Sequence, residues 1–406
     1  MDIVDSDEDS EVYLPVLPMD MDREEDDSEE DEMSEEQRVL TALSEQSMSS
    51  TVDLSDMDLT DDGAVLVAQW LQDKKMAIKV KTIKTFSSNN NHNNNHNDTT
   101  RHVAIEKLNL GSNNISDVGA VALAAALPPS LRFLELGRNN ICTEGSKALA
   151  QALLRPDCTD TTTTEAAVAL RVDYLSLQFN CVVQPEASLA WANTLASPYT
   201  MLQTLYLCTS FMGDMGIYLI ANAMKQNKRL RKLWLCNNSV TSWGAAQLAE
   251  MLYTNNTLEL LCLDANQIGT EGAISFASVL QDDRAVTVLE ELYVRDNCIG
   301  PPGTRALCEA VQHNHKLVRV FSNCDSRACA EEEALQFMVQ WNRLGLYRLL
   351  DRNPDTAIPA EFCPIILTRL LRTDSCNPML DRVYHWIRNA PELFSAKQQQ
   401  QQQQQR

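Results

Sequence analysis

The sequence predicts an α/β solenoid, a stack of about nine units that each contain a short strand and a helix, closed at the C-terminal end by further helices. Two observations predict it. One pattern of apolar residues, asparagine and glycine recurs from residue 52 to about residue 324. Within each copy, apolar residues first occur at every second position, typical of a strand, and then at every third or fourth position, typical of a helix.

The clearest copy spans residues 108–127. Leu108 and Leu110 lie on the same face of a predicted strand, Asn113 follows in the turn, and Gly119 opens the predicted helix. Other clear copies begin at Leu134, Leu233, Leu261 and Leu292, and weaker ones begin at Val52, Leu175, Leu205 and Val318. We expect the asparagine side chain to satisfy backbone groups that the turn leaves unpaired. We expect the glycine to let neighbouring helices approach closely.

On these residues, the sequence resembles the ribonuclease-inhibitor-like class of leucine-rich repeat between residue 52 and about residue 324. The resemblance implies a leucine-rich repeat solenoid, a horseshoe in which strands and full α-helices alternate and the strands line the concave surface. It does not imply one function. The same horseshoe serves ribonuclease inhibitor, Ran GTPase-activating proteins, tropomodulin-like actin regulators and the sensor portions of NOD-like receptors.

Composition divides the chain into four segments. Residues 1–36 hold 18 Asp or Glu against one Arg, so we expect an acidic disordered tail. An asparagine-rich run separates the first two repeats and predicts a flexible insertion. The predicted segments are the acidic tail 1–50, the repeat domain 51–324 with a disordered insertion near 73–101, a helical cap 325–396, and a polyglutamine tail 397–406.

The predicted cap contains apolar residues at helical spacing, beginning with Leu335, Met338 and Val339, and it would cover the last apolar face of the stack. This segment resembles the closing region of repeat proteins common in diatoms and related microalgae. The matching stretches are residues 341–350, 364–370 and 384–394. This resemblance implies a lineage and no particular reaction.

Several classes of function are not expected. The chain shows no secretory signal and no apolar run of membrane-spanning length, so we expect a cytoplasmic protein, with the nucleus left open. It is acidic and has no extended basic stripe, which disfavours nucleic acid as a partner. The twelve cysteines form no C-x-x-C pair, so we expect reduced thiols and no metal site. No catalytic motif is present, and we expect no enzyme activity, cofactor or small-molecule substrate.

The predicted concave face is the candidate binding site. Residues beside the strand leucines should point into it, and aromatic residues cluster there. Tyr206 and Trp234 should be neighbours, with Tyr293 two strands further on. In the last unit, Arg319 takes the outward position. The candidate partner-binding residues are Phe133, Glu135, Tyr174, Tyr206, Lys232, Trp234, Asp264, Tyr293 and Arg295.

The leading hypothesis is a non-enzymatic scaffold that binds a protein partner of unknown identity on this concave strand face. One alternative is a Ran-type GTPase-activating protein, for which Arg138 and Arg295 are the arginines in clear strand-to-helix loops. In that family the acidic tract follows the repeats, whereas here it precedes them. A second alternative is an innate-sensor-like adaptor, although no nucleotide-binding module is evident in the sequence.

Overall fold

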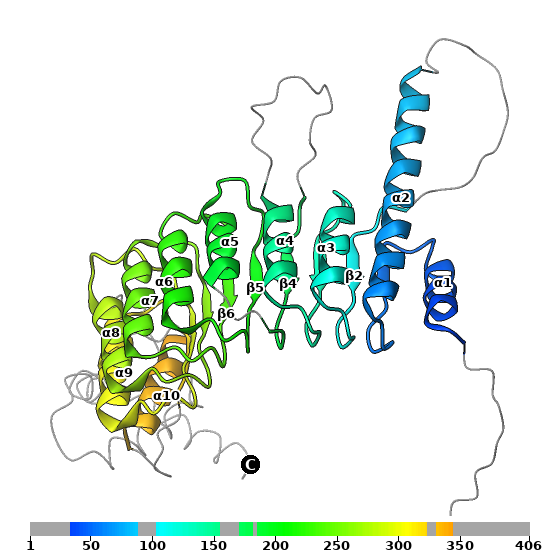
Figure 1. Ribbon diagram of the computed structural model, residues 1–406. Coiled ribbons are helices and arrows are strands. Elements are labelled where there is room, and N and C mark those ends of the chain that lie inside the picture. Colours follow the sequence, from blue (N-terminus) through cyan, green and yellow to red (C-terminus); the bar gives the residue numbers. More distant parts are fainter. Residues whose placement is uncertain (1–32, 88–102, 155–169, 182–184, 323–329, 344–406) are drawn as a thin grey trace, which may run out of the picture. The chain divides into compact units, whose positions relative to one another are not determined.

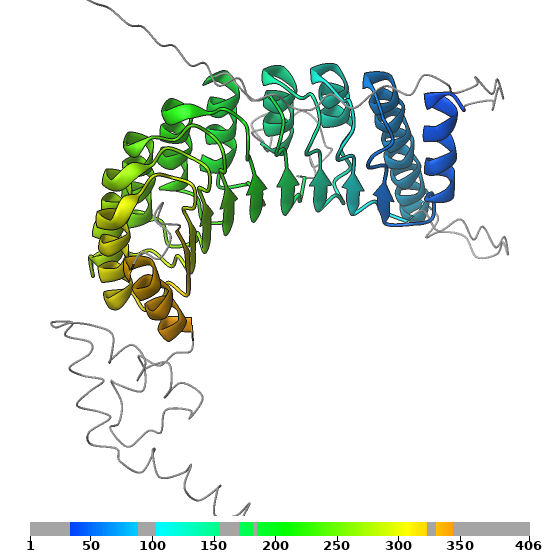
Figure 2. The same cartoon turned by 90° about the horizontal axis from the view of Figure 1, so that it is seen from below.

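The computed structural model describes residues 33–87, 103–154, 170–181, 185–322 and 330–343. The chain divides into two compact units, Met1–Ser34 and Glu35–Arg406, and the following description concerns the second. In its described residues, nine parallel strands form one sheet in chain order, each hydrogen-bonded to the next (Figure 1). Helices alternate with these strands and lie along one side of the sheet (Figure 2). This arrangement confirms the predicted leucine-rich repeat horseshoe.

Each strand is three residues long, and its middle residue is buried on the side of the helices. The strands are β1 (Thr51–Asp53), β2 (Lys107–Asn109), β3 (Phe133–Glu135), β4 (Tyr174–Ser176), β5 (Thr204–Tyr206), β6 (Lys232–Trp234), β7 (Leu260–Cys262), β8 (Glu291–Tyr293) and β9 (Arg319–Phe321). The helices are α1 (Glu35–Glu45), α2 (Asp61–Ser87), α3 (Asp117–Ala126), α4 (Thr143–Leu153), α5 (Pro185–Ala196), α6 (Gly213–Met224), α7 (Ser242–Thr254), α8 (Gly269–Gln281), α9 (Gly300–His313) and α10 (Ala330–Arg343).

The register of the last strand differs from the prediction. Val320 pairs with Leu292, so the ninth repeat begins at Val320 and its predicted start at Val318 was wrong by two residues. A third buried apolar residue, three positions before the middle of the strand, fixes the register of every repeat after the first. It is Ile105, Leu131, Val172, Leu202, Leu230, Leu258, Leu289 or Leu317.

Buried asparagines join consecutive repeats at the turns after six of the nine strands, as predicted. The Nδ2 of Asn139 donates to the carbonyl of Leu110 in the preceding repeat at 2.9 Å, and its Oδ1 accepts from the N–H of Ile115 at 3.0 Å. Equivalent bonds recur in other repeats, so these side chains satisfy turn backbone that neither strand nor helix pairs. The residues are Asn113, Asn139, Asn180, Asn238, Asn266 and Asn297.

Aspartates in the first turns of three helices cap the helix of the next repeat. Asp61 of α2 accepts from the N–H groups of Ser116 and Gly119 at 2.8 and 2.9 Å, where α3 begins. Asp117 and Asp214 make equivalent bonds to the start of α4 and α7. A methyl group on Gly119 would lie 2.7 Å from Asp61 Oδ1. The absence of a side chain at Gly119 therefore allows the Asp61 carboxylate to come close enough to cap α3.

The two ends of the described solenoid are helical. At the C-terminal end, α10 packs on α9 and buries Leu335, Met338 and Val339 as the predicted cap required. At the N-terminal end, α1 packs on α2 and buries Val39 and Leu43. Residues 1–50 were expected to be a disordered tail, and α1 lies within them. The helix forms because Val39 and Leu43, one turn apart, give it an apolar stripe that packs on α2.

The insertion also differs from its expected boundaries. Helix α2 continues to Ser87, although the disordered insertion was placed near 73–101. The remainder of that insertion, the acidic residues 1–32, and the predicted cap and polyglutamine tail from residue 344 onward lie outside the described residues.

Candidate interaction face

The face of the sheet that points away from the helices carries the first and third residues of each strand, and we call it the sheet face. Aromatic side chains form a continuous row on it from β3 to β9. We call this row the aromatic ladder; it consists of Phe133, Tyr174, Tyr206, Trp234, Tyr293 and Phe321.

Strand register explains most of the ladder. Phe133 and Tyr174 are direct partners on β3 and β4, and their rings stack with centroids 4.1 Å apart. Tyr206 and Trp234 are direct partners on β5 and β6, with centroids 5.0 Å apart. Their predicted adjacency is confirmed. Tyr174 reaches Tyr206 diagonally at 5.4 Å, which closes the gap between the two pairs.

Strand β7 contributes no ring, and the ladder bridges it. Cys262 lies between Trp234 and Tyr293 in the register of β6, β7 and β8. The two ring centroids are 5.7 Å apart, whereas strands two places apart are separated by about 9.6 Å. The rings therefore lean toward one another over Cys262, which explains why this residue is fully buried on the exposed side of the sheet.

Stacking determines which part of each ring a partner could contact. In three ladder pairs the rings are nearly parallel, with interplanar angles of 11°, 12° and 22°, so neighbouring rings cover one another's faces. Ring edges carry partial positive charge and attract oxygen acceptors. A partner on the sheet face would therefore contact the edges of the ladder rings more than their faces.

Two tyrosine hydroxyls of the ladder are held by carboxylates of the same face. Tyr174 donates to Glu135 at 3.2 Å. Burial is the main cause that raises the pKa of Tyr174, and the negative charge of Glu135 raises it further. Tyr293 donates to Glu291 at 2.7 Å, and burial together with this hydrogen bond raises its pKa to about 12. Both phenols stay protonated at neutral pH, and each hydrogen bond fixes the orientation of its ring.

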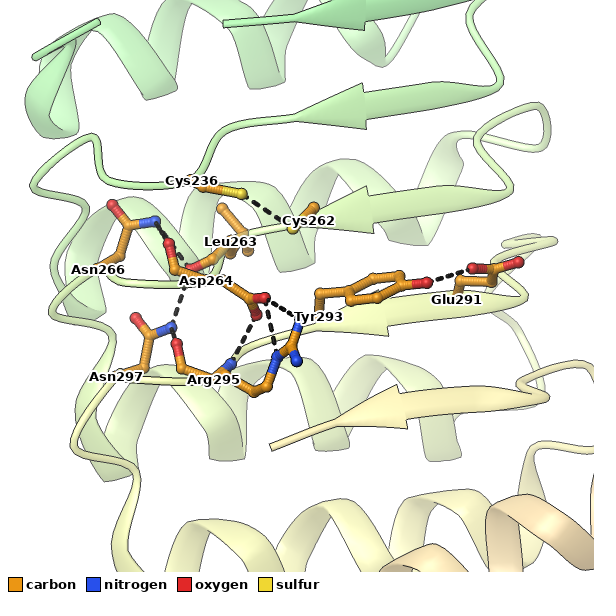
Figure 3. A network of polar contacts seen from close by, with 9 residues as sticks. All are labelled: Cys236, Cys262, Leu263, Asp264, Asn266, Glu291, Tyr293, Arg295 and Asn297. Atoms are coloured by element: carbon orange, nitrogen blue, oxygen red, sulfur yellow. Dashed lines mark hydrogen bonds and ion pairs between the residues drawn. The ribbon is translucent and has the colours of Figure 1, made fainter. Parts of the chain in front are cut away.

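An ion pair between Arg295 and Asp264 lies beside Tyr293 of the ladder, as Figure 3 shows. The Arg295 guanidinium donates to Asp264 Oδ2 through Nε at 3.0 Å and through a terminal nitrogen at 2.8 Å. Burial raises the pKa of Asp264, and the bonds from Arg295 oppose that shift. The same guanidinium lies 5.3 Å from the ring centroid of Phe321, a cation–π distance.

The structure places all nine predicted site residues on the sheet face or at its C-terminal edge. Lys232 is exposed at the start of β6, and Asp264 and Arg295 follow β7 and β8. Arg295 is bound to Asp264, and Arg138 lies over the ring of Phe179 at 5.2 Å. Both loop arginines named for the GTPase-activator alternative therefore have intramolecular partners.

Sequence reasoning missed one residue of this face, Phe321, and several exposed aromatic residues elsewhere. Phe321 was missed because the ninth repeat was read two residues early; the spacing from Leu289 to Leu317 could have corrected it. Glu291 was expected to point outward from this face, and it accepts hydrogen bonds from Arg319 at 2.5 Å and from the hydroxyl of Tyr293. The exposed aromatic residues lie in the loops and helices after β4 to β6 and are Phe179, Phe211, Tyr218 and Trp243.

Comparison with known proteins supports the repeat assignment. A model described as "Leucine Rich repeat" matches residues 105–124, 254–277 and 287–308. Among solved structures, the leiomodin-1 actin-binding site 2 is similar at 17% identity and a TM-score of 0.34, covering 41% of this chain and 95% of that chain. An internalin of Listeria monocytogenes 4b F2365 is similar at 16% identity and a TM-score of 0.25, covering 57% and 78%. No curated protein matches the chain.

In the part of the chain that the structure describes, no helix has the length and apolar character needed to cross a membrane. The ribonuclease-inhibitor-like subclass and the microalgal character of the C-terminal segment stay predictions, and the stretches 364–370 and 384–394 lie outside the described residues. The family-model matches within residues 105–124, 254–277 and 287–308 and the nine-stranded parallel sheet of the described residues together show that the chain contains leucine-rich repeats arranged as a solenoid.

Proposed function

We propose that this protein is a non-enzymatic scaffold that binds a protein partner on its sheet face. The observation that carries the proposal is the aromatic ladder. Tyrosine and tryptophan dominate binding hot spots in protein interfaces, and they do so as clusters in the centre of the contact. Four of the six ladder residues are of these two types.

The ladder is organised before any partner arrives. Its rings are fixed by stacking, and Tyr174 and Tyr293 are also fixed by hydrogen bonds to carboxylates. Ordering flexible side chains on binding costs about 0.5–1.5 kcal/mol for each one, and this cost is largely absent for a pre-stacked row. The proposed site therefore favours affinity through rigidity.

The dimensions of the sheet face fit a macromolecule better than a small ligand. The ladder crosses seven strands, from β3 to β9, which corresponds to about 29 Å at 4.8 Å per strand. Charged residues border it, including exposed Lys232 and the Asp264–Arg295 pair. An apolar centre with a charged rim is the usual composition of a protein interface.

The test is affinity capture from native lysate with the full chain as bait. The ladder variant Tyr206→Ala, Trp234→Ala, Tyr293→Ala is compared with a control variant, Tyr218→Ala, Trp243→Ala. The control removes an exposed aromatic pair, 5.8 Å apart, from the helix side. Circular dichroism and a thermal melt first establish that both variants fold. We expect a partner captured by the wild type and the control to be lost by the ladder variant.

A charge reversal, Lys232→Glu, provides a second test that leaves the ladder intact. This side chain is exposed, so the substitution carries little folding cost. For a partner that contacts the sheet face, we expect at least a fivefold change in dissociation constant, measured by isothermal titration calorimetry. Identical capture by wild type and ladder variant would move the site away from the sheet face.

A further inference from the structure

Three cysteines that lie 26 to 28 residues apart in sequence meet beside the ladder. Cys208 and Cys236 follow β5 and β6 at equivalent positions of consecutive repeats, and Cys262 ends β7. The sulfur atoms of Cys236 and Cys262 are 3.0 Å apart (Figure 3). Cys208 lies close enough to Cys236 to influence the pKa of its thiol. All three are free thiols, and Cys208 and Cys262 are buried while Cys236 is half-buried.

The central position of Cys236 favours its ionised form. The neighbouring Cys208 and Cys262 thiols, whose effect outweighs burial, lower the pKa of Cys236 below that of an ordinary thiol. Cys236 in turn raises the pKa of these two thiols. The other ionisable groups facing the cluster are Tyr206 and Asp264, and the charge of Asp264 is offset by Arg295. This environment favours a Cys236 thiolate in contact with a neutral Cys262 thiol.

We propose that Cys236 is a peroxide-reactive site, and that its oxidation ends in a disulfide with Cys262. Thiolates and not thiols are the nucleophiles in this chemistry, and a reactive cysteine is partly accessible. Cys236 meets both conditions. Cys262, being buried, is reached only through it.

Both steps balance with hydrogen peroxide as the two-electron oxidant. The Cys236 thiolate attacks one peroxide oxygen, the O–O bond breaks, and hydroxide leaves, which gives a sulfenic acid. The Cys262 sulfur then attacks the Cys236 sulfur, forming the S–S bond and breaking the S–O bond. The departing hydroxyl takes the Cys262 proton and leaves as water. One thiolate and one thiol have been oxidised to one disulfide, and the peroxide has been reduced to one hydroxide and one water.

The geometry suits this product. A disulfide bond is about 2.05 Å long, so the two sulfurs need to approach by about 1 Å. The bond would join the end of β7 to the residues that follow β6, directly beneath the bridge that Trp234 and Tyr293 make over Cys262. The redox state of this pair would therefore bear on the packing of the ladder, whether or not the sheet face binds a partner.

Peptide mapping of the full chain after brief hydrogen peroxide treatment tests the pairing. Trypsin leaves both cysteines in one peptide, since no Lys or Arg lies between them, so a Glu-specific protease is added to cut at Glu250 and Glu259. With free thiols blocked, we expect a Cys236–Cys262 crosslinked pair that is absent from Cys236→Ser. The Cys262→Ser variant should instead accumulate a sulfenic acid at Cys236, trapped by dimedone. The control Cys298→Ser, which removes an exposed thiol, should form the crosslink as the wild type does.

Alkylation by iodoacetamide gives a second readout. The rate at Cys236 should fall between pH 8 and pH 6 by much less than the roughly 75-fold decrease expected of an ordinary thiol with a pKa near 8.5. Replacing both neighbouring thiols, in Cys208→Ala with Cys262→Ala, should restore the ordinary pH dependence. A peroxide-resistant Cys236, a crosslink to Cys208 instead, or an ordinary pH profile in the wild type would each overturn the proposal.

Discussion

Trp234 and Tyr293 contact each other across a strand that contributes no ring, with their centroids 5.7 Å apart over the buried Cys262. Aromatic pairs of this kind are coupled by about 0.5–1.5 kcal/mol beyond the area that they bury. We therefore expect a double-mutant cycle of Trp234→Ala and Tyr293→Ala to give a coupling energy in that range, measured by urea unfolding.

The matched control cycle pairs Phe133→Ala with Tyr293→Ala, two ladder residues that are not neighbours. Mutations at distant sites add within about 0.3–0.5 kcal/mol. A Trp234–Tyr293 coupling no larger than that of the control pair would mean that the two rings do not support each other in solution.

The buried asparagines should be costly to remove. Asn266 accepts from the N–H groups of Asn238 and Val240 and donates to the carbonyls of Leu235 and Leu263. Asn266→Ala strands all of these groups in the interior, so we expect a loss of about 2–4 kcal/mol in the free energy of unfolding. Asn193→Ala, at an exposed position of α5, should change it by less than about 0.5 kcal/mol in the same denaturation assay.

The aspartate caps predict a dependence on pH. Burial raises the pKa of Asp61, but hydrogen bonds from Ser116 and Gly119 outweigh it, and the net pKa lies below the ordinary 3.8. A lowered native pKa contributes stability above the unfolded pKa, and that stability is lost as pH falls through the native value. Asp61→Asn should thus lower the free energy of unfolding by about 1 kcal/mol at pH 6.

This difference between wild type and Asp61→Asn should shrink as the pH falls below about 3.8. Urea midpoints between pH 6 and pH 3 provide the measurement. Asp62→Asn is the control, since its exposed side chain neighbours Asp61 in the same helix turn. A deficit in Asp61→Asn that stays constant over this range would exclude the ionised carboxylate as the cap.

Left-handed residues precede the buried asparagines and predict a stabilising substitution. Ala265 has φ of 56°, where a side chain is strained and glycine is not. Ala265→Gly should raise the thermal midpoint, corresponding to a gain of up to about 1 kcal/mol. The same change in a helix, Ala246→Gly in α7, should lower stability by about 1 kcal/mol. A loss at both positions would show that the turn is relaxed with alanine.

The strands and helices of the repeats could be predicted because the leucines, asparagine and glycine of each copy occur at the same spacing. Leu134 with Leu136 and Asn139 with Gly145 repeat at fixed offsets, and only one fold buries all of them together. The register of β9 could not be read with the same certainty. In that repeat, Ser322 occupies the position where the other repeats have their second strand leucine. The alternation of apolar residues therefore fits Val318 and Val320 better than the true pair, Val320 and Ser322.

The ladder was predictable in part. Alternation along a strand fixes which face a side chain takes, and that placed Tyr206, Trp234 and Tyr293 on one surface. It does not fix how far a side chain leans along or across strands. The contact of Trp234 with Tyr293 and the meeting of Cys236 with Cys262 depend on such leaning, so they follow from the structure alone.

The aspartate caps and the buried asparagines act in opposite directions along the chain. Asp117 of one repeat completes the start of α4 in the next, whereas Asn139 of that next repeat completes the turn before α3. Neither repeat can be excised without stranding polar backbone in the other. Such reciprocal dependence makes the interfaces between repeats strong relative to each repeat alone, so we expect internal repeats to melt together and not to unzip singly from an end.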